Sequence, residues 1–469
     1  MTTKPTTLLK DEVIRNLTER GINVASFISF GPDGGQRFCR VRGLHPTNPF
    51  SDPESAVRAM YNTGHISMVN VRTFLPEKPD GNPFFLGSKN GFKDPVVAAQ
   101  CVAEYVRKGF HVIVNEDIPT DDGGFSGVAM KDAVEFAACE TPRCVDKGDE
   151  MPCAKLSLKL TRRLVSEVYG FNFILPFSPA YRVEFSVHPG PVGYFGTKLT
   201  IWQAEEMLAA PVAPVPVWPN RYSVHMGDKA FGLLMAWLHD FPVPYTTVFG
   251  RVIPPFSFGE PVYSGEGGWI RTCPRTQEPG RYTTQRGWLD PFALMEREDP
   301  ERKNISAIIL QQGIKAGYSG AAITGSDGNA IIEGKEGRGD RFMLGEVGIA
   351  DLPKHIANDV MALWFALRES FGVVRFEWVY DSYHKKVWIV QLHGGASLSV
   401  GDEIYPGEAV RWVDFKVPGD LEELRELSKQ ARAGGFGIRL VGNIGITSHP
   451  CDILRRDKVP SRLSRNMRI

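Results

Sequence analysis

The chain has 469 residues, of which 42% are hydrophobic and 23% are charged, as in an ordinary globular protein. Lys and Arg (54) balance Asp and Glu (54), which excludes a chain built mainly to coat nucleic acid or an anionic membrane. No apolar run approaches the roughly 20 residues that span a bilayer, the N-terminus lacks an apolar leader, and the cysteines form no CxxC pair. We therefore expect a cytoplasmic protein of about three domains.

The sequence predicts strands that alternate with helices along the chain. β-branched runs predict strands at 112–114 and 307–310, and helical spacing predicts helices over 155–169 and 354–369. The alternating prolines of 211–219 predict an extended linker. After residue 395, leucines at helical spacing predict a helix over 420–433, followed by a strand at 437–441. This mixture favours an α+β or α/β fold.

The sequences on the two sides of the linker repeat each other in order, at an offset of roughly 190–220 residues. An ordered series that includes Lys, Arg, Glu and Gln indicates a tandem duplication. The alternative is that similar α/β units repeat similar patterns without common origin. The first copy supplies Lys10, Val71–Thr73, Phe125–Ala129, Glu135, Arg182–Phe185 and Thr200–Gln203, and the second supplies Asp228–Lys229, Ile270–Thr272, Tyr318–Ala322, Glu333, Arg375–Trp378 and Trp388–Gln391.

The polar residues of the second copy are suited to ATP and magnesium. Lys offers a point charge and Arg a planar fork to phosphate oxygens, while carboxylate and amide oxygens are hard ligands for Mg²⁺. We expect Glu377 and Gln391 to pair across adjacent antiparallel strands and to face one metal. Taken alone, each residue is better explained as a solvated strand residue, because most charged residues lie at the surface. The set is Lys229, Arg271, Gln311, Glu333, Glu377 and Gln391.

These residues resemble the ATP-binding domain of the pyruvate phosphate dikinase and phosphoenolpyruvate synthase family. The resemblance covers residues 221–393 and, more faintly, 8–205. It implies an ATP-grasp fold in which Lys229, Arg271, Gln311 and Glu333 bind ATP and Glu377 with Gln391 binds Mg²⁺. The matching segments are Met226–Ala230, Phe241–Pro244, Ile270–Thr272, Leu310–Gln311, Ser319–Gly320, Glu333, Gly337–Asp340, Glu377 and Gln391.

The C-terminal segment Gly445–Arg455 with Val459–Pro460 resembles the phosphohistidine motif of the same family's swivelling domain. The resemblance implies that His449 accepts a phosphoryl group. Neutral imidazole is a nucleophile, and the catalytic set then consists of His449, Thr447, Ser448 and Arg455. Pro450 suits the first turn of a helix whose amides favour a phosphate. Pro450 and Arg456 depart from the family pattern, and no barrel for phosphoenolpyruvate follows, so its synthesis is not implied.

The first copy retains polar equivalents of the same set but lacks the glycine before its lysine. We expect a degenerate ATP-grasp-like copy. Whether it binds a second nucleotide, binds the substrate or acts as a scaffold stays open. The equivalents are Lys10, Arg72, Glu135, Glu184 and Gln203.

Together these patterns predict an α+β protein with tandem ATP-grasp-like units (1–209 and 221–395), a linker at 210–220 and a truncated α/β phosphohistidine-like domain at 396–469. We expect an ATP- and Mg²⁺-dependent phosphotransferase of the dikinase type. Its partners are the nucleotide and an unidentified phosphoryl acceptor, without nucleic acid or membrane. An ATP-grasp ligase or direct kinase without a phosphohistidine, or a non-catalytic nucleotide-binding regulator, are the alternatives.

Overall fold

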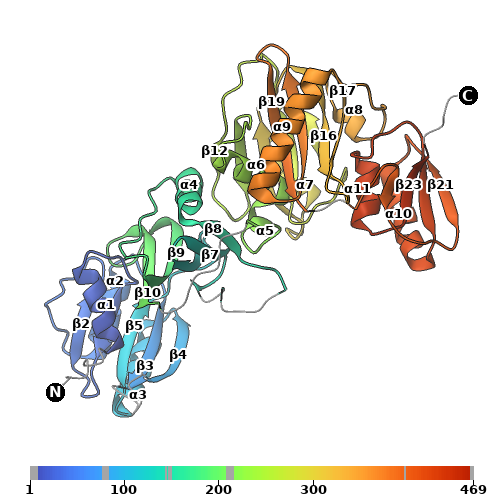
Figure 1. Cartoon of the computed structure of the whole chain (residues 1–469). Coiled ribbons are helices and arrows are strands. Elements are labelled where there is room, and N and C mark those ends of the chain that lie inside the picture. Colours follow the sequence, from blue (N-terminus) through green and yellow to red (C-terminus); the bar gives the residue numbers. More distant parts are fainter. Residues whose placement is uncertain are drawn as a thin grey trace, which may run out of the picture. The chain divides into compact units, whose positions relative to one another are not determined.

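The computed structural model describes residues 9–75, 84–142, 145, 150–207, 216–395 and 398–464 (Figure 1). The chain forms two compact units, and each is discontinuous in sequence. Unit 1 comprises Met1–Gly148 and Phe171–Ala213, and unit 2 comprises Asp149–Gly170 and Pro214–Ile469. The break after Ala213 falls within the predicted linker, whose residues 210–215 lie outside the described part of the chain.

Unit 1 contains two antiparallel sheets. The first has the order β2-β1-β5-β3-β4 and packs against helices α2 and α3, whose apolar faces share one core with β1, β3 and β5. Of the second sheet, unit 1 contributes the strands β10, β9, β6 and β7, in that order. The elements are α1 (Lys10–Glu19), β1 (Phe27–Phe30), β2 (Gln36–Arg40), α2 (Pro53–Asn62), β3 (Val69–Leu75), β4 (Phe84–Phe92), α3 (Pro95–Arg107), β5 (His111–Glu116), β6 (Phe125–Met130), β7 (Ala133–Ala138), β9 (Tyr181–Val192) and β10 (Thr197–Glu206).

Unit 2 repeats this arrangement with sheets ordered β12-β11-β15-β13-β14 and β17-β16-β18-β19. Helix α9 lies against the second of these sheets (Figure 1). The elements are β8 (Ala154–Ser157), α4 (Leu158–Tyr169), α5 (Ser223–Met226), α6 (Asp228–Leu238), β11 (Thr246–Gly250), β12 (Phe256–Phe258), β13 (Trp269–Pro274), β14 (Thr284–Arg286), α7 (Pro291–Glu298), β15 (Ile305–Gln311), β16 (Ala316–Thr324), β17 (Ala330–Glu336), α8 (Asp340–Met343), α9 (Lys354–Phe371), β18 (Val374–Asp381) and β19 (Lys386–Gly394).

The two units have the same strand order when each strand of unit 1 is matched with its counterpart in unit 2. In both, a Glu and a Gln pair across neighbouring strands beside a register shift: Glu184 with Gln203, and Glu377 with Gln391. A tandem duplication would produce this correspondence, although the duplication itself stays a prediction.

The C-terminal segment adds an α/β layer to unit 2. Strands β21, β22 and β23 are parallel, β20 joins β23 antiparallel, and α10 connects β21 to β22. The core of this layer includes Ile323 of β16, so residues 398–464 pack onto the preceding sheet within the same compact unit. Its elements are β20 (Glu403–Tyr405), β21 (Trp412–Lys416), α10 (Leu421–Gly434), β22 (Gly437–Val441), α11 (His449–Arg456) and β23 (Ser461–Ser464).

The predicted secondary structure is largely confirmed. The predicted strands lie within β5, β15 and β22, and the helix predicted over 354–369 lies within α9. The helix predicted over 420–433 corresponds to α10, which begins and ends one residue later. The helix predicted over 155–169 begins later, at Leu158. Ala154–Ser157 forms a strand instead, and the Ser157 hydroxyl accepts a hydrogen bond from the Leu160 amide at 3.2 Å as the N-cap.

Helix α4 belongs to unit 2, although the sequence places it in the first copy. It packs against α6 and β12. Arg163 of α4 donates to the carbonyls of Leu238 at 2.5 Å and Trp237 at 3.3 Å at the end of α6. The Trp237 carbonyl also accepts from the Asp240 amide at 3.0 Å, so the contact matters most for the terminal Leu238 carbonyl.

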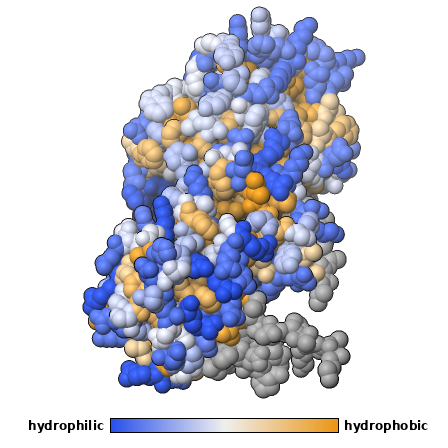
Figure 2. All heavy atoms as spheres, turned by 90° about the vertical axis from the view of Figure 1, so that its left-hand side faces the viewer, coloured by the Kyte–Doolittle hydropathy of each residue, from blue (hydrophilic) through white to orange (hydrophobic). Residues whose placement is uncertain are grey.

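None of the described helices is both long and apolar enough to cross a membrane. On the face drawn in Figure 2, hydrophobic residues occur in groups among hydrophilic ones. The cytoplasmic location stays a prediction.

We predict that Gly232→Ala destabilises unit 2. Gly232 lies on α6 facing β19, and an added Cβ would come within 1.8 Å of the Leu392 carbonyl oxygen. Backbone atoms cannot yield as a flexible side chain does, so the free energy of unfolding should fall by about 2 kcal/mol or more. Urea denaturation followed by tryptophan fluorescence measures this change.

The matched control is Gly190→Ala on β9, where nothing lies within 4 Å of the added Cβ. It should change the stability by less than about 0.5 kcal/mol. A Gly232→Ala protein as stable as the wild type would contradict the close contact between α6 and β19.

Candidate functional site

A pocket in unit 2 is built around the start of α6. Gly227, which precedes the helix, has φ +87°, and a Cβ there would lie 2.6 Å from the Cβ of Cys273 on β13. Glycine therefore permits both the backbone turn and the close approach of α6 to β13. As a result Lys229 of α6 and Arg271 of β13 line the same pocket.

Lys229 and Arg271 carry positive charge into a poorly hydrated place. Burial lowers the pKa of both side chains, and the nearby Glu377 carboxylate opposes both shifts. Arg271 donates to the Val390 carbonyl at 2.7 Å, while its Nε has no hydrogen-bond partner among the described residues. Within that same part of the chain, no hydrogen bond or ion pair engages the Lys229 ammonium. An anion in the pocket would compensate the positive charge of both side chains.

Glu377 and Gln391 lie side by side in the same pocket. As predicted, they are partners across antiparallel strands, here β18 and β19. The described residues include no group of three or more His, Cys, Asp or Glu able to hold a metal by themselves. One carboxylate and one amide oxygen suit Mg²⁺, which keeps several waters and shares its site with phosphate oxygens. The pair therefore fits Mg²⁺ that arrives with a phosphate ligand.

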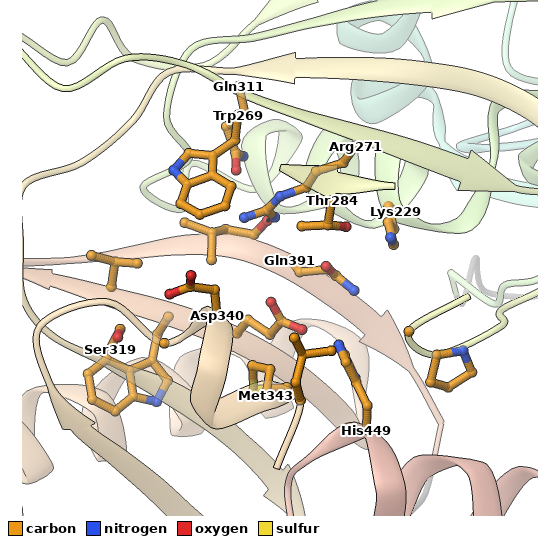
Figure 3. Close-up of a pocket in the computed structure, with 18 of the residues that line it drawn as sticks. Lys229, Trp269, Arg271, Thr284, Gln311, Ser319, Asp340, Met343, Gln391 and His449 are labelled. Atoms are coloured by element: carbon orange, nitrogen blue, oxygen red, sulfur yellow. Dashed lines mark hydrogen bonds between the residues drawn. The ribbon is translucent and has the colours of Figure 1, made fainter. Parts of the chain in front are cut away.

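Figure 3 shows how the pocket is arranged. Lys229, Arg271 and Thr284 lie on one side, Asp340 and His449 lie opposite them, and Gln391 lies between. Gln311, at the end of β15, is buried beside Trp269, and its amide donates to the Thr246 hydroxyl at 3.3 Å.

His449 begins helix α11 and lines the same pocket as Lys229. Its Nδ1 lies 3.4 Å from a carboxylate oxygen of Asp452, one helical turn onward. A carboxylate accepts hydrogen bonds, so it favours the tautomer that carries the proton on Nδ1 and leaves the Nε2 lone pair available.

Asp452 is itself held by two guanidinium groups. Burial alone would raise the pKa of this carboxyl group, but Arg375 and Arg455 hold it well below its usual range. Both arginines form ion pairs with the same carboxylate oxygen, and Arg375 also donates to the Thr447 carbonyl at 3.1 Å. Asp452 therefore stays ionised, with its other oxygen directed to His449.

Four predicted site residues hold the His449 loop in place and do not line the pocket. The Glu333 carboxylate accepts from the amide and the hydroxyl of Thr447, both at 2.9 Å. The Ser448 hydroxyl donates to the Gly445 carbonyl at 2.6 Å. Arg455 donates to the Ile446 carbonyl and the Ser399 hydroxyl as well as to Asp452. Their predicted contacts with ATP or phosphohistidine stay predictions.

The first-copy residues lie in unit 1 and are partly engaged with each other. The Lys10 ammonium donates to the Gln203 amide oxygen at 3.4 Å. Glu184 pairs with Arg182 on the same strand at 2.5 Å. Arg72 lies on β3 and Glu135 on β7.

Sequence reasoning missed Asp452, Arg375 and His393 as parts of the site. For two of these residues, the spacing from a predicted site residue in the sequence indicated that the two side chains would be neighbours. Asp452 follows His449 by three residues at the start of a helix, and His393 follows Gln391 by two residues on one strand face. The role of Arg375 depends on its contact with a loop about seventy residues away, which no local pattern encodes.

No family model and no curated protein matches the chain. Solved structures show a weak, partial similarity to ATP-grasp ligases. The D-alanine–D-alanine ligase of Coxiella burnetii matches at 10% identity over 37% of this chain and 49% of that one, with a TM-score of 0.26. The Bacillus anthracis enzyme complexed with ATP matches at 14% identity over 37% and 57%, with a TM-score of 0.24. The L-amino acid ligase of Bacillus licheniformis matches at 16% identity over 37% and 41%, with a TM-score of 0.23.

The chain thus spans about half the length of the ligases that it matches. None of these structures is a dikinase, and the similarity to ligases is too weak to carry an activity. The resemblance to the dikinase family stays a prediction.

We predict that Lys229→Met stabilises the nucleotide-free protein and weakens nucleotide binding. Burial lowers the Lys229 pKa, so the folded state binds this proton less tightly than the unfolded state, which destabilises the fold at any pH below the ordinary lysine pKa. Methionine removes that cost. Loss of a charged contact should weaken ATP binding by about 10- to 100-fold.

Thermal melts with and without Mg²⁺–ATP measure both effects, because a ligand that binds the folded state raises the melting temperature. Lys354→Met, at an exposed position at the start of α9, is the control and should alter neither value. An unchanged ATP-dependent shift in Lys229→Met would remove Lys229 from the binding site.

Proposed function

We propose that unit 2 binds ATP with Mg²⁺ and that His449 accepts a phosphoryl group from it, for transfer to an acceptor still to be identified. One observation carries this proposal: His449 lines the same pocket as Lys229, Arg271, Glu377 and Gln391. The nucleophile and the groups suited to phosphate and metal therefore meet in one place.

Lys229 and Arg271 bind the phosphate oxygens in this proposal. Their buried charges, short of partners, exchange a desolvated state for charge-assisted hydrogen bonds to the anion. Glu377 and Gln391 hold Mg²⁺, which neutralises charge on the phosphate oxygens. Catalysis then rests on positioning and charge neutralisation, as is general for phosphoryl transfer.

His449 supplies the nucleophile. Its Nε2 lone pair forms a bond to phosphorus while the bond from phosphorus to the leaving phosphate oxygen breaks, and the electron pair leaves with the nucleotide. The ring gains positive charge, which the ionised Asp452 at Nδ1 stabilises. The start of α11 supports the new phosphoryl group with backbone amides.

A direct ATP-grasp ligase or kinase is the second candidate. It is favoured by the engagement of Thr447, Ser448 and Arg455 within the fold, which leaves His449 without the predicted hydroxyl and arginine partners. In that case a second substrate, rather than His449, attacks the nucleotide. A nucleotide-binding regulator without turnover is the third candidate.

Labelling separates these candidates. Full-length protein is incubated with Mg²⁺ and ATP carrying ³²P at the β or the γ position, and acid-labile protein label is measured. We expect label in the wild type and none in His449→Ala or His449→Asn. His384→Ala, which removes a histidine that pairs with Asp381 at 2.7 Å, should keep the label.

The position of the retained ³²P shows whether AMP or ADP is released. ATP turnover without protein label would indicate the ligase or direct kinase, and binding without turnover would indicate the regulator. Label that persists in His449→Ala would refute the role of His449.

A further inference from the structure

Asp228 and Gln391, which line the pocket, are joined through His393 by a chain of hydrogen bonds. An Asp228 carboxylate oxygen contacts Nδ1 of His393, and Nε2 of His393 lies 2.6 Å from the amide nitrogen of Gln391. His393 and Gln391 are 4% and 7% exposed, so water does not compete for these bonds. The chain links the start of α6 to β19.

This chain determines which way the Gln391 amide points. Asp228 accepts the Nδ1 proton of His393, which leaves Nε2 as an acceptor. An acceptor takes the NH₂ end of the Gln391 amide and not its oxygen. The amide oxygen is therefore directed away from His393, on the side where Gln391 lines the pocket with Glu377.

Unit 1 contains the same amide orientation. The amide nitrogen of Gln203 donates to Glu205, two residues onward along β10, and its oxygen accepts from Lys10. Lys10 is the predicted counterpart of Lys229. In both units, then, the residue two positions after the glutamine takes the NH₂ group, although one is a glutamate and the other a histidine.

We propose that His393 is a positioning residue that fixes the Gln391 amide with its oxygen toward the metal site. The proposal rests on the proposed function, in which Gln391 binds Mg²⁺. An amide has one end that can bind a cation and one that cannot, so an unrestrained Gln391 would present its NH₂ group for part of the time. Groups that orient a ligand in this way typically change metal affinity by about 10- to 100-fold.

A double-mutant cycle with Gln391→Glu tests orientation directly. Either oxygen of a carboxylate can bind a cation, so a Glu at this position presents a metal ligand in both orientations and needs no partner to orient it. Mn²⁺ is titrated into the full-length protein with a non-hydrolysable ATP analogue, and bound metal is read from its electron paramagnetic resonance signal. His393→Phe should weaken Mn²⁺ binding by about 10-fold or more in the wild type. The same change in the Gln391→Glu protein should cost at most about 2-fold.

Two further variants keep the test interpretable. His384→Phe removes another Asp–His pair of unit 2, between His384 and Asp381, and should leave Mn²⁺ binding unchanged. His393→Gln retains an acceptor and a donor at the end of its side chain. It should bind Mn²⁺ more tightly than His393→Phe, and it replaces that variant in the cycle if His393→Phe does not fold.

The outcomes separate this proposal from the proposed function. Wild-type binding of Mn²⁺ with the analogue, together with unchanged binding in His393→Phe, overturns the positioning role alone. An equal loss in both backgrounds also overturns it, because His393 then only holds α6 against β19. Absence of any Mn²⁺ or nucleotide binding to the wild type overturns the proposed function and this inference with it.

Discussion

The buried ion pair between Arg375 and Asp452 is the contact on which the site geometry depends. Arg375 lies on β18, two residues before Glu377 and on the same strand face, so one strand carries both the predicted metal ligand and the anchor for the His449 helix. Removing one partner of a buried pair typically costs about 3–5 kcal/mol, because the remaining charge loses its counterpart. Together with the bonds from Glu333 to Thr447, this pair keeps His449 facing Lys229 and Arg271.

Charges in the pocket are compensated less completely than the charges around Asp452, which holds His449 in place. Asp452 has two cations around it and stays ionised, whereas Lys229 and Arg271 share the influence of Glu377 and have pKa values lowered by burial. Charge is thus fully compensated where the structure must be rigid and under-compensated where a ligand is expected. Burying a cation without a partner destabilises the ligand-free site. An anion that supplies the missing partner relieves this cost, which favours its binding over that of a neutral molecule.

The sequence allowed prediction of features that follow from local spacing. The pairing of Glu377 with Gln391 followed from two neighbouring strand patterns, and the helix at Pro450 followed from the preference of proline for the first turn of a helix. The contacts of Glu333 could not be predicted, since its partner Thr447 lies 114 residues away and the contact exists only after the C-terminal layer has packed. The same holds for α4, whose helical pattern gave no indication of the unit it joins.

The placement of α4 has a consequence for how the two units can be separated. The backbone passes from one unit to the other after Gly148, after Gly170 and after Ala213, so no single cut yields a whole unit. A fragment that starts at the proline-rich segment would lack Arg163 and leave the Leu238 carbonyl, at the end of the helix that carries Lys229, without its side-chain donor. Unit 2 therefore needs a helix from the first half of the sequence, whether or not unit 1 binds a ligand of its own.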